Sequence, residues 1–131
     1  MRLWNALSAS SLCIVAFVLA GCASVPKVQA SVTPGGEPLS IAASDFRFDP
    51  NVIAVHGLGA IMLKITNSGG TAHNITVDTP SGKAIKSVEI PPHSMISTHV
   101  VFDGPGDYNF FCSHPFHADL GMKGHFLVLE K

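Results

Sequence analysis

The chain has 131 residues, of which 47% are hydrophobic and 13% are charged, and its formal net charge is −1. That length fits one domain and a leader. Eight Lys or Arg against nine Asp or Glu give no basic patch of the kind that binds nucleic acid, which excludes that class of partner, and none of the kind that binds anionic lipid.

The first 21 residues have the pattern of a secretory signal peptide. Arg2 precedes an apolar run, Leu12–Leu19, which is shorter than the about 20 residues of a membrane-spanning helix and ends in small residues. The run closes on Leu19-Ala-Gly-Cys22, which resembles the lipobox of bacterial lipoproteins. The resemblance implies cleavage before Cys22, acylation of Cys22, and a lipid-anchored place in the bacterial cell envelope, facing the periplasm or the exterior. The alternative is an ordinary signal peptide with an accidental cysteine.

Residues 22–38 are predicted to form a flexible tether. Pro26, Pro34 and Pro38, together with Gly35-Gly36, interrupt a stretch that has few large apolar residues. Such a stretch cannot bury a core of its own and behaves as a linker. It would hold the following domain away from a lipid bilayer to which Cys22 is attached.

From residue 39 the sequence changes to short runs typical of β-strands, separated by turn signals. No stretch shows a sustained helical period. Seven or eight short strands over residues 39–131 predict an all-β domain, folded as a two-sheet β-sandwich. The expected strands are Leu39–Ala43, Val52–Val55, Ala60–Thr66, Ala72–Val77, Val88–Ile90, Ser94–Phe102, Asp107–Cys112 and Lys123–Glu130.

A thiol, an imidazole and a thioether follow one another at equal spacing near the C-terminus. Cys112 is the one cysteine of the predicted domain, His117 follows it with four residues between, and Met122 follows His117 in the same way. These ligand types suit copper, and a blue-copper site combines them with a second histidine. We assign His73 as that second histidine.

This pattern, a distant His-Asn, then Cys, four residues, His, four residues and Met, resembles that of the cupredoxins. Asp45-Phe-Arg-Phe-Asp-Pro50 also resembles the opening of bacterial cupredoxin-like domains. The resemblance covers about residues 39–131. It implies a Greek-key sandwich that binds one type 1 copper ion through His73, Cys112, His117 and Met122.

The resemblance also assigns roles to two neighbours of the ligands. Asn74 and Ser113 tie the two ligand segments together, and the backbone N–H of Asn74 donates a hydrogen bond to the Cys112 sulfur. Partners of this kind tune a metal site.

Two alternatives concern the site itself. His114 competes with His117 as a ligand, but Pro115 restricts His114 to extended dihedrals, and a ligand so close behind Cys112 would strain the loop. Zinc competes with copper, but zinc gains little from a thioether. We therefore expect copper, held by His117.

The predicted function is a membrane-anchored carrier that exchanges single electrons with redox protein partners. Pro115 and Phe116, just before His117, are expected to form an exposed apolar patch where electrons leave the domain. The alternative is a copper-binding module for delivery or storage, although the methionines are scattered and no His-x-His occurs. An enzyme is not expected, because copper oxidases and nitrite reductases need further copper centres.

Overall fold

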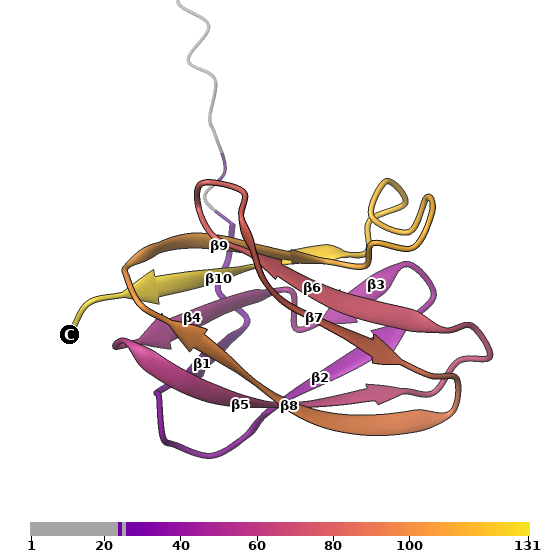
Figure 1. Cartoon of the computed structure of the whole chain (residues 1–131), viewed down its shortest axis with the longest axis horizontal. Helices are drawn as coiled ribbons and strands as arrows, with labels where there is room; N and C mark the ends of the chain where they lie inside the picture. Colours follow the sequence, from indigo (N-terminus) through magenta and orange to yellow (C-terminus); the bar gives the residue numbers. More distant parts are fainter. Residues whose placement is uncertain (1–23, 25) are drawn as a thin grey trace, which may run out of the picture.

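The computed structural model describes residue 24 and residues 26–131, so the leader and Cys22 lie outside the described residues. The described part folds into ten strands in two facing sheets, of six and four strands (Figure 1). The six-stranded sheet has the order β1-β4-β10-β9-β6-β7 and the other the order β3-β2-β5-β8. The strands are β1 (Ala30–Val32), β2 (Leu39–Ser44), β3 (Arg47–Asp49), β4 (Val52–His56), β5 (Gly59–Asn67), β6 (His73–Asp78), β7 (Ala84–Ile90), β8 (Ser94–Phe102), β9 (Gly106–Phe111) and β10 (Lys123–Leu129).

Side chains that alternate between buried and exposed along strands such as β5 explain why the two sheets pack face to face. In β5, Ile61, Leu63 and Ile65 are buried, whereas Met62 and Lys64 between them are exposed. Successive side chains of a strand point to opposite faces, so this pattern gives the sheet one apolar face and one solvated face. The core is the layer between the two apolar faces.

Four phenylalanines fill the centre of this layer. The rings of Phe110 and Phe126 lie 4.6 Å apart between centroids, and Phe110 also meets Phe48 at 5.5 Å. Phe102 contacts Phe126 at 5.4 Å. Because Phe110 lies two residues before Cys112, the packed core fixes the strand from which the thiol projects.

The predicted all-β, Greek-key sandwich is confirmed, and the strand count is higher than the seven or eight expected. The two unpredicted strands, β1 and β3, have three residues each, too few for a visible alternation of apolar and polar residues. β1 also corrects the extent of the flexible tether predicted at residues 22–38. Ala30–Val32 pairs in parallel with β4, and Val32 joins the core because only 8% of it is exposed.

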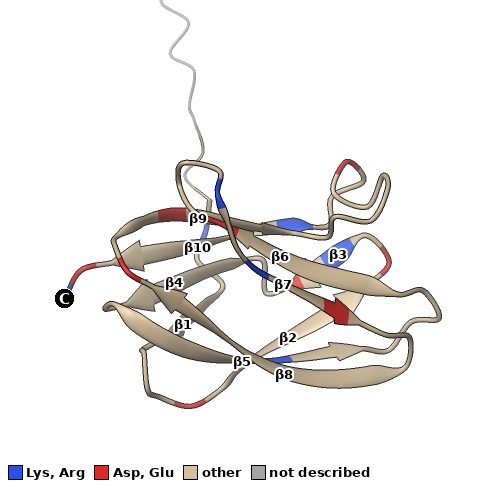
Figure 2. Cartoon of the chain, in the orientation of Figure 1, with Lys and Arg blue, Asp and Glu red and all other residues tan. Residues whose placement is uncertain are grey.

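Positions of both signs, Lys and Arg as well as Asp and Glu, are spread over several of the described strands and loops (Figure 2). No helix in residues 26–131 is long and apolar enough to cross a membrane.

Three segments far apart in the sequence meet at one end of the sandwich. They are the β2–β3 turn, the start of β6, and the segment 112–122 between β9 and β10, here called the ligand loop (Figure 1). The C-terminus lies at the opposite end (Figure 1). This gathering places the predicted ligands together.

Candidate metal centre

Two neighbouring strands hold the base of the ligand loop. Cys112 follows the last residue of β9, and Met122 precedes the first residue of β10. The backbone N–H of Cys112 donates to the carbonyl of Met122 at 3.0 Å, which closes the loop at its base. Both residues are fully buried, with no exposed surface. Met122 N–H in turn donates to the His117 carbonyl at 2.9 Å, which ties the middle of the loop to this base.

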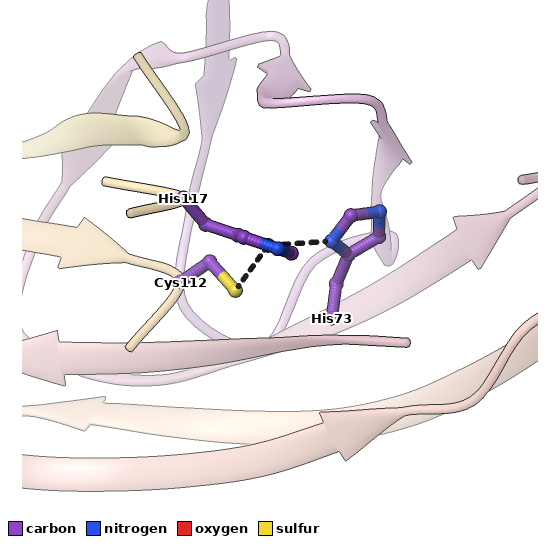
Figure 3. Close-up of side chains that lie close together, drawn as sticks. All are labelled: His73, Cys112 and His117. Carbon is purple, nitrogen blue, oxygen red and sulfur yellow. Dashed lines mark hydrogen bonds between the residues drawn. The ribbon is translucent and has the colours of Figure 1, made fainter. Parts of the chain in front are cut away.

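The loop and β6 bring two imidazoles and the thiol to one point (Figure 3). The Nδ1 atoms of His73 and His117 are 3.2 Å apart, and Cys112 Sγ lies 3.4 Å from His117 Nδ1. The ligand atoms of all three residues lie within 4.8 Å of one another. No other group of three such residues that could hold a metal occurs in the described part of the chain.

These separations fit a single metal ion. A first-row ion lies about 2.0 Å from nitrogen ligands and about 2.3 Å from sulfur. In a trigonal arrangement the two nitrogens would then be about 3.5 Å apart, and nitrogen and sulfur about 3.7 Å. The observed 3.2 Å and 3.4 Å are a few tenths of an ångström shorter. The side chains therefore need only a slight opening to take the ion.

Burial prepares His73 for metal binding. Its side chain is 1% exposed. This burial lowers the pKa of His73, and the nearby His117 lowers it further. A histidine must be neutral to bind a metal, so the lowered pKa keeps Nδ1 available at neutral pH. The other ring nitrogen, Nε2, is buried and has no hydrogen-bond partner among the described residues.

Asn74 connects the strand of His73 to the ligand loop. Its backbone N–H donates to Cys112 Sγ at 3.4 Å. Its side-chain Oδ1 accepts from the Ser113 N–H at 2.7 Å, and its Nδ2 donates to Ser113 Oγ at 2.8 Å. The contacts that the cupredoxin resemblance implied at Asn74 and Ser113 are therefore present.

Comparison with protein families decides which class of protein has this site. A scan matches residues 11–128 to the cupredoxin-like domain. The chain belongs to this family. In this cupredoxin, His73, Cys112, His117 and Met122 are arranged as a type 1 copper site. A search of the curated proteins gives no significant match.

Solved structures similar to this cupredoxin include three auracyanins. The dithionite-reduced auracyanin of Roseiflexus castenholzii is 20% identical, with a TM-score of 0.64 over 70% of this chain and 96% of that one. Auracyanin B is 18% identical, with a TM-score of 0.59 over 80% of this chain and 92% of its own. Auracyanin A of Chloroflexus aurantiacus, described as a blue copper protein, is 16% identical, with a TM-score of 0.58 over 71% of this chain and 100% of its own. At identities this low, the structural similarity shows a shared fold and no more.

His114 lies outside the group of ligand atoms. Its ring nitrogen Nε2 is 3.1 Å from Glu89 Oε2, and its ring centroid is 5.5 Å from that of His117. The side chain is engaged with a carboxylate on β7, so the geometry favours His117 over His114 as the ligand. Of the other histidines outside the site, His56, His93 and His99 are exposed and His125 is half-buried.

Two residues near the site were missed in the sequence. Phe46, in the β2–β3 turn, places its ring edge-on to His117, with centroids 5.2 Å apart. It belongs to the Asp45–Pro50 motif, which could have pointed to it. Glu89 contacts both Asn74 and His114, and it was missed because only the register of β6 and β7 places it there.

The predicted patch residues are exposed. Phe116 is 74% exposed and has a left-handed backbone, with φ of 69°. Pro115 beside it is also exposed. Leu120 on the same loop is 60% exposed and Phe46 is 40% exposed. These four residues are called the apolar patch below: Phe46 contacts the half-buried His117, and the other three share its loop.

Proposed function

We propose that this cupredoxin carries single electrons between redox proteins, as an exported protein anchored to a membrane of the bacterial cell envelope. Copper bound at the site would gain and lose one electron as it cycles between its two oxidation states. The chain's own residues hold the ligands, exclude water and offer a surface to partners.

The observation that carries the proposal is the burial of the ligands on rigid elements. His73 is 1% exposed, and Cys112 and Met122 have no exposed surface. Two of them adjoin paired strands and one begins a strand. Ligands held in this way keep their geometry when the charge of the ion changes. A delivery or storage module would instead need ligands from which copper can be passed to a partner.

The half-buried His117 supports a route for electrons to the surface. It is the one ligand of the four that is not buried. Phe46 of the apolar patch contacts its ring, the other patch residues share its loop, and Asp119 is the one charged residue of the ligand loop. Exposed apolar patches mark contact sites for partners. A patch of this kind can be desolvated quickly and released quickly, as an electron carrier requires.

The test of the metal centre is the visible spectrum of the copper-loaded protein. An intense band that bleaches on reduction, and that is absent from Cys112→Ser, is expected because the colour needs a copper–thiolate bond. A colourless protein that passes copper(I) to a chelator would instead indicate copper delivery or storage. A band that persists in Cys112→Ser would refute the site.

The test of the electron route is Phe116→Glu in the copper-loaded protein. We expect severalfold slower electron self-exchange, with the spectrum nearly unchanged, because a charge then lies in the contact surface. Val101→Glu is the matched control, since Val101 is 53% exposed and lies at the end of β8 that pairs with Gly59 and Ala60. Equal rates in Phe116→Glu and the control would place the route elsewhere.

The anchoring part of the proposal depends on Cys22. Each buried CH₂ contributes about 0.8 kcal/mol to membrane binding, so several acyl chains on one residue anchor firmly. Cell fractionation of Cys22→Ala should move the protein from the membrane to the soluble fraction. A variant that remains with the membranes would refute the lipid anchor.

A further inference from the structure

Glu89 on β7 bridges the two segments that carry the copper ligands. One carboxylate oxygen, Oε1, accepts a hydrogen bond from Asn74 Nδ2 at 3.2 Å. The other, Oε2, contacts His114 Nε2 at 3.1 Å. Asn74 follows the ligand His73 on β6, and His114 lies two residues after the ligand Cys112. A single side chain on the edge strand of the sheet therefore contacts both segments.

The contacts of Glu89 and Ser113 leave the Asn74 side chain only one orientation. The Ser113 backbone N–H can only donate, so it requires the Asn74 oxygen Oδ1. The Glu89 carboxylate can only accept, so it requires the Asn74 nitrogen Nδ2. Both donors and the acceptor of the Asn74 side chain are thereby used. This fixes the residue whose backbone N–H donates to Cys112 Sγ at 3.4 Å.

The exposure of Glu89 argues against a mainly stabilising role. Its side chain is 64% exposed, and that of His114 is 29% exposed. A contact so open to solvent contributes little to stability. Its position between Asn74 and His114 therefore matters more for the geometry of the site than for the fold.

We propose that Glu89 is a positioning residue of the copper site, which acts through Asn74 on the Cys112 thiolate and through His114 on the start of the ligand loop. The inference rests on the proposed function. Glu89 also places a carboxylate in direct contact with Asn74, whose backbone N–H donates to Cys112 Sγ. A negative charge near the ion favours the more highly charged metal, so its removal should raise the reduction potential.

Two variants separate the geometric effect from the effect of charge. Glu89→Ala removes both contacts and the charge. Glu89→Gln removes the charge but keeps an oxygen that can accept from Asn74 Nδ2. Glu130→Ala is the matched control, because Glu130 is an exposed carboxylate after the last strand with no hydrogen bond among the described residues.

The first measurement uses the copper-free protein. Hydrogen exchange of the Ser113 backbone N–H, followed by NMR, should be severalfold faster in Glu89→Ala, because the Asn74 side chain then loses one of the contacts that hold its orientation. In Glu89→Gln and Glu130→Ala it should remain at the wild-type rate. Unchanged exchange in Glu89→Ala would overturn the positioning role, whether or not the protein binds copper as proposed.

The second measurement uses the copper-loaded protein. Glu89→Ala should shift the visible band and raise the reduction potential, Glu89→Gln should raise the potential with the band unchanged, and Glu130→Ala should change neither. If the wild-type protein has the copper–thiolate band but both Glu89 variants match Glu130→Ala in band and potential, the inference about Glu89 is overturned and the proposed function is not. Absence of a copper–thiolate band from the wild-type protein would refute the proposed function. The Ser113 exchange rate in the copper-free protein would still show whether Glu89 positions Asn74.

Discussion

Replacing Asn74 with alanine should strongly destabilise the copper-free domain. The variant loses the two side-chain hydrogen bonds to Ser113, at 2.7 and 2.8 Å, and the one to Glu89, at 3.2 Å. Each is worth about 0.5–1.5 kcal/mol net. Because Ser113 and Glu89 are exposed and water can replace part of what is lost, we expect a total of about 2–3 kcal/mol. A small domain with about 5–15 kcal/mol of stability would still fold.

The assay is urea denaturation of the copper-free domain, followed by fluorescence or circular dichroism. Asn109→Ala is the matched control, since Asn109 is an exposed asparagine on β9 whose side chain has no hydrogen bond among the described residues. The control should change the free energy of unfolding by less than about 0.5 kcal/mol. A loss in Asn74→Ala of less than about 1 kcal/mol, or one no larger than in the control, would refute the reasoning that these hydrogen bonds join β6 to the ligand loop.

Three further predictions follow from the site and the core. Met122→Leu should keep copper but raise the reduction potential, because it removes a weak axial donor that favours the oxidised ion; an unchanged potential in voltammetry would point to another axial group. Since burial lowers the pKa of His73 from 6.5, the unfolded chain takes up this proton first, so the copper-free domain should lose stability as the pH falls below about 6.5; urea midpoints that are equal at about pH 7.5 and about pH 5 would contradict this. Gly124→Ala should cost about 1–3 kcal/mol, because a Cβ there would collide with the Asn51 carbonyl oxygen and a core ring, whereas Gly104→Ala, where a Cβ meets nothing within 4 Å, should leave thermal unfolding nearly unchanged.

The metal ligands could be predicted from the sequence because copper chemistry restricts the residue types. Cys112, His117 and Met122 are close in the chain, so their spacing alone shows that they can share one loop. His73 is 39 residues from Cys112, and its assignment depended on the cupredoxin resemblance and on the Asn that follows it. The structure brings the thiol of Cys112 and the imidazoles of His73 and His117 within 4.8 Å of one another.

The surroundings of the ligands were harder to predict, because they depend on register and turn geometry. Glu89 reaches Asn74 because the two residues are opposite one another in the β6–β7 pairing, and a shift of one residue would turn Glu89 to the other face. Phe46 reaches His117 from a turn with a left-handed backbone, φ 57°. The contact of Glu89 has no pattern that can be recognised before the strands are paired. Phe46 lies in the Asp45–Pro50 motif, but that motif does not show that its ring meets His117.

The length of an element decided which parts of the fold could be predicted. The longest strands, β5 and β8 with nine residues each, carry enough alternation to be seen. β1 and β3 do not. Ala30–Val32 gives no signal of its own, and its place in the sheet depends on the neighbouring β4.

The pairing of β6 with β9, through Thr76 and Phe111, also affects how the chain folds. The ligand loop can form locally, but His73 joins it only after two strands distant in sequence have paired. Contacts of this kind form slowly, because the chain must lose the entropy of a long loop before they form. Copper binding is then a property of the fully folded chain, and a bound ion would stabilise that state over partly folded ones by an amount that rises with the logarithm of its free concentration. Copper supply can therefore influence how much of the newly made protein survives proteolysis.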